Sequence, residues 1–267
     1  GSTNATGTSA RFKNPWGITT DGTNLYVADR NNHTIRKIVI ATGAVTTLAG
    51  SPGATGSSNA TGISARFKYP NGITTDGTNL YVTDENNHTI RKIVISTGVV
   101  TTLAGSPGST GSTNGTSTSA RFKYPSGITT DGKNLYVADG DNNKIRKIVI
   151  ATGVVTTFAG STTSGSADGT GTAARFKYPR GITTDGTNLF VVSDNHLVRK
   201  IVISTAAVTT LAGSTSSGST DGTGTSARFN SPRGINTDGT NLYVVDASNN
   251  TIRKIVISTG VVTTIAG

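Results

Sequence analysis

The sequence predicts an all-β protein, a five-bladed β-propeller with four antiparallel strands in each blade. A stretch of about 41 residues occurs five times, at residues 10–50, 65–105, 120–160, 174–213 and 227–267. The first two copies are identical at 35 of 41 positions. No window of ten or more residues shows the 3.6-residue apolar period of a helix. A repeat of 53 to 55 residues built from short strands is typical of propeller blades, because one such sheet must bury its faces against neighbours.

The second copy shows the first two strands of a blade. Gly72–Thr75 is a short β-prone run that ends at Asp76 and Gly77, a dipeptide that favours a tight hairpin turn. The second strand is Leu80–Thr83, and it ends in the polar turn Asp84–His88. We therefore expect an antiparallel hairpin at the start of every copy.

Two further strands complete the copy. Ile90–Ile95 predicts the third strand, which ends at Thr97 and Gly98, and Val99–Leu103 predicts the fourth because it is rich in β-branched residues. The connectors between copies, such as 106–119, are rich in Gly, Ser and Thr and predict surface loops.

The five copies predict one domain over residues 1–267, with a ring closed by packing between the first and fifth blades. We expect a monomer. Two alternatives stay open, a fragment of a longer array and an assembly that completes a ring of six blades.

The motif residues of each copy resemble those of the NHL-repeat β-propellers. In the second copy they are Phe67, Pro70, Gly72, Ile73, Asp76, Asn79, Leu80, Tyr81, Val82, Asp84, Asn87, His88 and Ile90. The resemblance implies a propeller fold. It also implies two possible kinds of function. Some similar propellers bind RNA through a basic face, and others are lyases or lactonases. The family often has a basic residue after the Asn-His pair, where this chain has Thr34, Thr89 and Thr251, so we carry over no binding residue.

The net charge of +10 follows from the repeat. Arg66, Lys68, Arg91, Lys92 and their equivalents account for 19 of the 24 basic residues. Such a charge attracts nucleic acid or acidic glycans. We favour the interpretation that these side chains lie at the blade rims, with their charged ends in solvent and their aliphatic stems packed over apolar rings. The chain has no dense basic run that would indicate a nucleic-acid site.

Composition excludes several classes of protein. Cysteine is absent, so disulfides and thiolate metal sites are excluded, and no apolar run approaches the roughly 20 residues of a membrane span. A Cys-free chain rich in Ser, Thr and Gly favours a bacterial secreted or periplasmic setting. The near identity of the copies indicates either recent amplification or consensus design.

Candidate catalytic residues are few. The histidines His33, His88 and His196 share one turn position, which Asn143 and Asn250 fill in the other copies. We expect them to stabilise the turn rather than bind metal. The five Asp-Gly turns could ring a cation, but their hairpin role already explains them. The sequence therefore predicts no enzyme activity, no cofactor and no metal.

The positions that differ between copies are the candidate ligand-binding residues. The most divergent position precedes the inner-strand glycine and is occupied by Trp16, Asn71, Ser126, Arg180 and Arg233; a second, in the adjacent turn, is occupied by Arg30, Glu85, Gly140 and Ala247. We expect the first set to encircle the channel mouth, with Trp16, Arg180 and Arg233 in one subsite. The predicted function is a non-catalytic scaffold or binding module for a protein, peptide or glycan. RNA binding is the second hypothesis and an enzyme the third, and a protein with no ligand of its own stays open.

Overall fold

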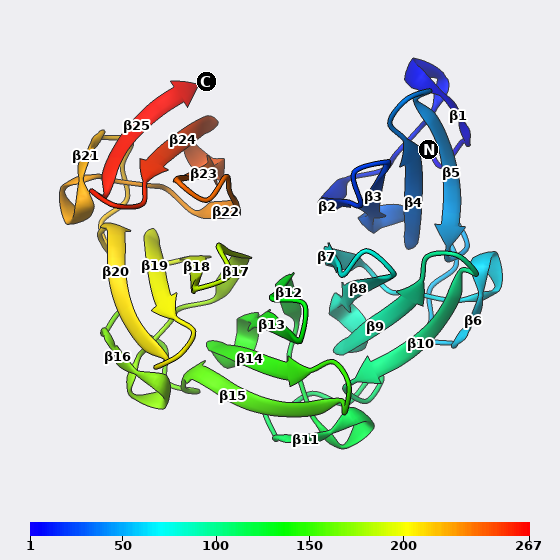
Figure 1. Cartoon of the computed structure of the whole chain (residues 1–267), viewed down its shortest axis with the longest axis horizontal. Coiled ribbons are helices and arrows are strands. Elements are labelled where there is room, and N and C mark those ends of the chain that lie inside the picture. The colour runs from blue at the N-terminus through cyan, green and yellow to red at the C-terminus, as the bar shows by residue number, and fades with distance from the viewer. The chain divides into compact units, whose positions relative to one another are not determined.

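The computed structural model describes all 267 residues and contains five antiparallel sheets, one for each repeat (Figure 1). Each sheet is one blade of a β-propeller, so the predicted fold class and blade number are confirmed. Helical structure is limited to three-residue 3₁₀ turns. No helix is long and apolar enough to cross a membrane.

The four long strands of each blade follow the predicted order. They are β2 (Pro15–Thr20), β3 (Asn24–Asp29), β4 (Thr34–Val39) and β5 (Ala44–Ala49) in the first blade; β7 (Pro70–Thr75), β8 (Asn79–Asp84), β9 (Thr89–Val94) and β10 (Val99–Ala104) in the second; β12 (Pro125–Thr130), β13 (Asn134–Asp139), β14 (Lys144–Val149) and β15 (Val154–Gly160) in the third; β17 (Pro179–Thr184), β18 (Asn188–Ser193), β19 (Leu197–Val202) and β20 (Ala207–Gly213) in the fourth; and β22 (Pro232–Thr237), β23 (Asn241–Asp246), β24 (Thr251–Val256) and β25 (Val261–Ala266) in the fifth. The predicted strands of the second copy lie within two residues of these bounds.

Each blade also has a fifth strand, which the sequence did not predict. These strands are two residues long and come from the connectors: β1 (Ala5–Thr6), β6 (Ala60–Thr61), β11 (Gly115–Thr116), β16 (Gly169–Thr170) and β21 (Gly222–Thr223). In the first blade Ala5 pairs with Val45 and Thr6 with Ala44, so the connector covers the outer edge of the sheet. An uncovered edge would expose unpaired backbone groups, which is why part of the connector is ordered against it.

The 3₁₀ turns occur at two places in the repeat. Those that follow the short outer strand are η1 (Gly7–Ser9), η3 (Gly62–Ser64), η5 (Ser117–Ser119), η7 (Gly171–Ala173) and η8 (Gly224–Ser226). Those between the second and third long strands are η2 (Arg30–Asn32), η4 (Glu85–Asn87), η6 (Gly140–Asn142) and η9 (Ala247–Asn249). The fourth blade has no 3₁₀ turn at the second place because its sequence is one residue shorter there.

The chain divides into two compact units, residues 1–133 with 149–155 and residues 134–148 with 156–267. The first unit contains the first two blades, and the second contains the fourth and fifth. The third repeat contributes residues to both units.

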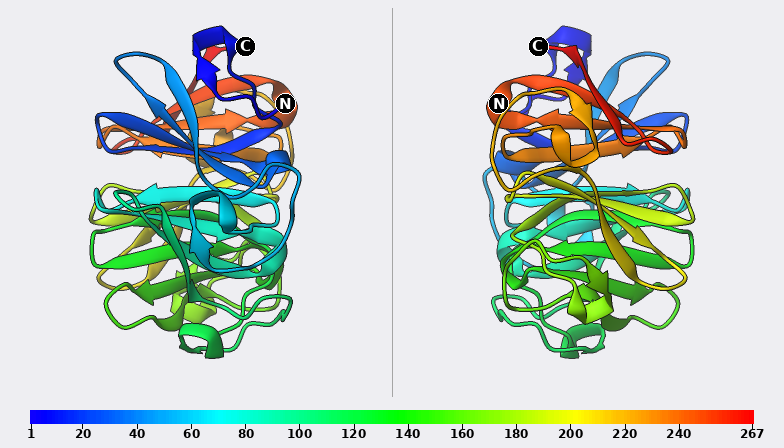
Figure 2. Two further views of the ribbon diagram at one scale, coloured as in Figure 1. Left: turned by 90° about the vertical axis from the view of Figure 1, so that its right-hand side faces the viewer. Right: turned by 90° about the vertical axis from the view of Figure 1, so that its left-hand side faces the viewer.

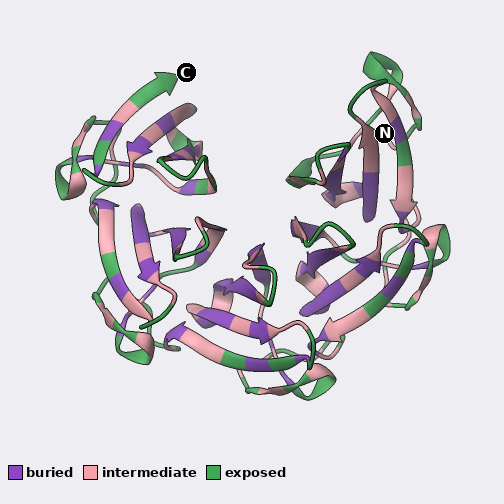
Figure 3. Cartoon of the chain, viewed as in Figure 1, coloured by how far each residue is buried: buried purple, intermediate pink, exposed green.

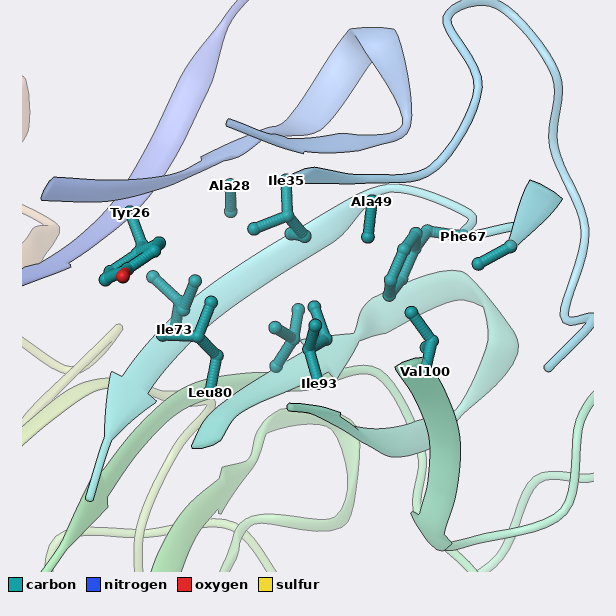
Figure 4. Close-up of a cluster of buried hydrophobic side chains, with 11 residues drawn as sticks. Tyr26, Ala28, Ile35, Ala49, Phe67, Ile73, Leu80, Ile93 and Val100 are labelled. Carbon is teal, nitrogen blue, oxygen red and sulfur yellow. The ribbon is translucent and has the colours of Figure 1, made fainter. Parts of the chain in front are cut away.

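In the first unit, the first blade packs face to face on the second, as the blue and cyan strands show in Figure 2 (left). The buried side chains between them are drawn in Figure 4 and include Tyr26, Ala28, Ile35 and Ala49 from one blade and Phe67, Ile73, Leu80, Ile93 and Val100 from the other. Alternate residues of a strand point to opposite faces, and the fourth blade accordingly buries Leu189, Val191 and Ile201 in one cluster and Phe190, Val192 and Val198 in another. The long strands are accordingly mostly buried, whereas the hairpin turns and connectors are exposed (Figure 3).

Glycine is required where the inner strands of neighbouring blades approach each other. A Cβ atom on Gly17 would collide with the carbonyl oxygen of Asn71, and one on Gly72 with that of Ser126. In the second unit, Gly181 faces the carbonyl oxygen of Arg233 in the same way. At these three positions the glycine of one inner strand therefore lies against the residue that precedes the glycine of the next inner strand.

The second unit repeats the packing of the first. Its fourth and fifth blades share a buried cluster that contains Phe190, Val192, Val198 and Ala212 from one blade and Phe229, Leu242, Val244, Ile255 and Val262 from the other. Blade-to-blade packing is thus the same in both units.

The repeated arginine of the third long strand is fully buried. Arg91 donates from Nη1 to Asp84 Oδ2 at 2.9 Å and from Nη2 to Asn59 Oδ1 at 2.9 Å, and its guanidinium lies 5.1 Å from the centre of the Phe67 ring. Arginine–aspartate pairs of the same kind are Arg36–Asp29, Arg146–Asp139 and Arg253–Asp246. The expectation that the repeated arginines solvate the blade rims is therefore wrong for this position, where Arg91 joins a connector to two strands.

Candidate binding site

The turn histidines hold neighbouring blades together. His33 adopts a left-handed conformation with φ of 60°, and its Nδ1 accepts a hydrogen bond from the backbone N–H of Tyr69 at 3.2 Å. The two rings pack edge to face with centroids 4.7 Å apart. Burial, together with nearby Lys13 and Arg30, lowers the pKa of His33 and so favours the neutral imidazole that can accept this bond.

The same bond recurs at the other turns. His88 Nδ1 accepts from Tyr124 N–H at 3.3 Å and His196 Nδ1 from Ser231 N–H at 3.0 Å. Asn143 Oδ1 accepts from Tyr178 N–H at 2.9 Å, which explains why Asn substitutes for His in this slot. These side chains therefore bond to the backbone of the next blade, rather than within their own turn as the sequence predicted.

Strand register places the two variable positions of a blade side by side. Pro15 pairs with Asp29, so the residue after the proline lies next to the first residue of the following turn. Pro70 pairs with Asp84 in the same way. We call the residue before the inner-strand glycine and the residue fourteen positions later the variable pair of that blade.

In the first unit, two variable pairs form one cluster. The Arg30 guanidinium lies 4.7 Å from the centre of the Trp16 ring and donates from Nη2 to Glu85 Oε2 at 2.9 Å. Asn71 Nδ2 donates to the same Glu85 oxygen at 3.2 Å. Trp16 keeps 38% of its surface exposed, whereas Asn71 keeps 6%. The structure thus brings Trp16 and Asn71 together through a single ion pair, and Trp16 offers the larger surface to a ligand.

Ser126 lies beside this cluster but is buried, with 8% exposed. Its carbonyl oxygen accepts a hydrogen bond from the Thr83 hydroxyl at 2.6 Å. The third variable pair, Ser126 with Gly140, carries no large side chain.

In the second unit, Arg180 is bound to an acidic residue of its own blade. Its Nε and Nη2 both donate to the Asp194 carboxylate, the second at 2.7 Å, and its guanidinium lies 5.1 Å from the centre of the Tyr178 ring. Arg180 therefore does not present an open fork of donors to a ligand. Arg233, of the fifth blade, is exposed.

A polar cavity of about 280 Å³ lies next to the Arg180–Asp194 pair in the second unit. Its lining includes Lys177, Asp194, His196, Ser164, Ser166 and Thr215. These residues come from the connectors before and after the fourth blade and from its shortened turn. None of the five predicted ligand residues lines the cavity.

The Asp-Gly turns use their carboxylates within the hairpin. Asp76 Oδ1 accepts the backbone N–H groups of Thr78 and Asn79 at 2.9 and 2.6 Å, and Oδ2 accepts the Tyr81 hydroxyl at 2.7 Å. Burial alone would raise the pKa of Asp76, but these hydrogen bonds outweigh it and lower the pKa. The structure contains no group of three or more His, Cys, Asp or Glu side chains placed to hold a metal ion.

Comparison with known proteins identifies the repeat. A family model described as the NHL repeat matches residues 12–38 and 67–93, within the first two copies. The other three copies share the same strands and the same Asp-Gly turns. The chain is an NHL-repeat β-propeller.

Two curated relatives resemble this NHL propeller over part of their length. NHL repeat-containing protein 2 of Bos taurus is 33% identical over 162 residues, which are 57% of the chain and 22% of that protein. Protein SUPPRESSOR OF QUENCHING 1, chloroplastic, of Arabidopsis thaliana is 29% identical over 271 residues, 94% of the chain and 26% of that protein. The chain thus spans about a quarter of the length of these relatives.

Solved structures share the fold of the NHL propeller. An auxiliary nutrient binding protein from Bacteroides thetaiotaomicron has a TM-score of 0.61 and 18% identity, covering 95% of the chain and 69% of that structure. Virginiamycin B lyase from Staphylococcus aureus has a TM-score of 0.56 and 17% identity, covering 95% and 84%. One fold therefore serves proteins named for binding and proteins named for catalysis.

One residue of the NHL propeller's site escaped the sequence analysis. Asp194 belongs to the variable pair of the fourth blade, but the shortened turn hid its alignment with Arg30 and Glu85. Its backbone N–H bonds to Lys177 O at 2.9 Å, a bond that Asn86, the residue after Glu85, makes to Lys68 O at 3.1 Å, because the turn of the fourth blade is one residue shorter. The constant spacing of fourteen residues from the inner-strand position would have found it.

Proposed function

We propose that this NHL propeller is a non-catalytic binding module whose ligand contacts the variable pairs. The observation that carries this proposal is that a constant backbone frame holds a different pair in each blade. Trp16 stacks with Arg30, Asn71 bonds to Glu85, and Arg180 bonds to Asp194. A binding surface requires a constant backbone scaffold on which the exposed side chains can vary.

The structural use of the acid–base residues supports binding over catalysis. A lyase or hydrolase needs a base within reach of substrate. In this chain the three histidines accept backbone N–H groups through Nδ1. The buried aspartate Asp84 receives bonds from Arg91, Asn87 and the Lys68 backbone. These groups are committed to the fold.

RNA binding is the second candidate function, and the arginine positions weaken it. Arg36, Arg91, Arg146, Arg199 and Arg253 are fully buried and cannot contact phosphate. The net charge of +10 is unchanged by their pairing, so non-specific attraction to polyanions persists. Salt dependence separates the two functions, because binding that neutralises many phosphates weakens steeply as salt rises.

The experiment is a binding screen over glycans, peptides and single-stranded RNA at two salt concentrations. It compares the wild type with Trp16→Ala and with Arg180→Ala/Arg233→Ala, and uses Lys92→Ala as a control because this lysine lies on the third long strand, away from the variable pairs. We expect a glycan or peptide whose binding weakens about tenfold in one of the first two variants and changes little with salt.

Three results would contradict the proposal. The first is a ligand that none of the variable-pair substitutions weakens. The second is RNA binding that depends on salt and spreads over many basic residues. The third is turnover of any ligand found in the screen.

A further inference from the structure

We propose that the polar cavity of the fourth blade binds a carboxylated sugar, a uronic acid unit of a glycan. This inference rests on the proposed binding function and names a ligand class for one part of the surface. Apart from Asp194, which belongs to a variable pair, and His196, it concerns residues that the comparison between repeats did not single out, because the cavity is built from connectors and a shortened turn.

The cavity offers two hydrogen-bond donors suited to a carboxylate. Lys177 is exposed, and its ammonium group forms no ion pair in the structure. His196 already accepts the Ser231 N–H through Nδ1, so the neutral imidazole carries its proton on Nε2 and that atom is a donor. A cation beside a fixed N–H donor is a suitable partner for one carboxylate group.

The remaining lining suits the hydroxyl groups of a sugar. The charge of Asp194 is balanced by Arg180, and its oxygens remain able to accept hydrogen bonds from hydroxyls. Ser164, Ser166 and Thr215 each add a hydroxyl that donates and accepts. A phosphate would bring a second negative charge toward Asp194, and a neutral sugar would leave Lys177 unpaired, so a uronate matches this lining better than either.

The shortened turn fixes one wall of the cavity. Asn195 Nδ2 donates to the Gly165 carbonyl at 3.0 Å, which ties the turn to the connector that carries Ser164 and Ser166. The Ser193 hydroxyl in turn donates to Asn195 Oδ1 at 2.7 Å, and both residues are buried. The wall is therefore held in place by bonds within the protein, and a ligand need not order it.

The test is a titration of the full chain with D-glucuronate, followed by amide shifts in NMR spectra. We expect saturable shifts at Lys177, Asp194 and His196, with millimolar affinity, and no saturable shift with glucose. Lys177→Gln should weaken binding at least fivefold. The matched control is Lys68→Gln, which removes an exposed lysine from the same place in the second blade and should change affinity less than twofold.

A second variant keeps the fold while removing the imidazole donor. His196→Asn preserves the bond to the next blade, since Asn143 makes that bond in the third repeat. It should weaken glucuronate about threefold without lowering the melting temperature by more than a few degrees.

Four outcomes would overturn the inference. These are no saturable shift with glucuronate, equal binding of glucose, tighter binding of inorganic phosphate at the same residues, and equal weakening by Lys68→Gln and Lys177→Gln. If glucuronate fails while a ligand from the screen depends on Trp16 and not on Lys177, the cavity assignment is removed and the binding module remains intact.

Discussion

A single lost carboxylate in the fourth blade is compensated from another segment of the chain. Ser193 stands where the other blades have the aspartate that pairs with the buried arginine. Arg199 instead binds Asp168 Oδ1 at 2.7 Å, and Asp168 comes from the connector. The fifth blade retains both partners, since Arg253 binds Asp221 at 2.7 Å and Asp246 at 3.0 Å. The two blades therefore differ in how many carboxylates balance one buried charge.

This difference predicts unequal costs for the same substitution. Asp168→Asn should lower the free energy of unfolding by about 2 to 3 kcal/mol, because it leaves Arg199 buried without any carboxylate. Asp221→Asn should cost less than about 1 kcal/mol, since Asp246 still pairs with Arg253. Both aspartates also accept the N–H and hydroxyl of one threonine at 3.1 and 3.0 Å, so the comparison is matched. Urea denaturation measures both changes.

Adding Ser193→Asp to Asp168→Asn gives the control, because it restores the arrangement of the second blade, where Asn59 and Asp84 share Arg91. The double variant should recover most of the lost stability. Equal costs for the two single substitutions would show that Asp168 is not the partner on which Arg199 depends.

The sequence located the variable inner-strand residues but not their surroundings. Divergence between copies singled out Trp16 and Asn71, which the structure links through the Arg30–Glu85 pair. The sequence comparison could not show that Asn71 is 6% exposed and Trp16 38% exposed. The exposure of each residue depends on which side chain of the adjacent turn packs against it. The Arg30–Glu85 pair joins residues 55 positions apart and has no local signal.

At the scale of the element, the first hairpin of the second blade was predictable to within two residues of its strand bounds, but its register shift between Pro70 and Ile73 was not. Asp76 and Gly77 end one strand and Asn79 begins the next, and Gly77 has the expected positive φ of 88°. The fifth strand was not predictable, since Ala60–Thr61 is too short to show a pattern and is ordered only by pairing with β10. The buried role of Arg91 was also missed, because an arginine in an alternating strand normally indicates an exposed face.

The hairpin predicts a specific pH dependence. Tyr81→Phe removes the hydroxyl that bonds to Asp76, so the pKa of Asp76 should rise toward its ordinary value near 3.8. A carboxyl group whose folded-state pKa is lowered stabilises the fold at pH values above its unfolded pKa. This stabilisation is lost as the pH falls through the folded-state pKa. The variant should therefore be less stable by about 1 kcal/mol at neutral pH, with the difference narrowing in acid. NMR titration of the Asp76 carboxyl measures the pKa directly.

The fourth blade provides an internal reference for this experiment. Phe190 occupies the position of Tyr81 there, so Asp185 lacks a tyrosine partner. Asp76 in Tyr81→Phe should titrate close to Asp185 of the same protein. An unchanged pKa of Asp76 would show that the backbone N–H bonds alone lower it.

Packing between inner strands gives a second prediction at this scale. Gly72→Ala places a Cβ against the Ser126 carbonyl oxygen and should cost about 1 to 3 kcal/mol, because the two backbones must move apart. Thr78→Ala, in the exposed hairpin turn, is the control and should change stability by less than about 0.5 kcal/mol. Thermal unfolding of the two variants measures the difference, and equal melting temperatures would contradict close packing at Gly72.

At the scale of the whole molecule, the repeats and the compact units divide the chain differently. The boundary between the two units falls inside the third repeat, where residues 134–148 belong to one unit and residues 149–155 to the other. Neither unit therefore contains the whole of the third blade. Because half of a small antiparallel sheet is not stable alone, we expect each unit to depend on the other for this blade.

This division predicts one cooperative unfolding transition for residues 1–267. Gly72→Ala perturbs the first unit and Gly181→Ala the second, since each would place a Cβ against a neighbouring carbonyl. If the third blade makes the units interdependent, each substitution shifts the same single calorimetric transition, and the two shifts add in the double variant. Two transitions, each moved by only one of the substitutions, would show instead that the units unfold separately and that the chain is not one folding domain.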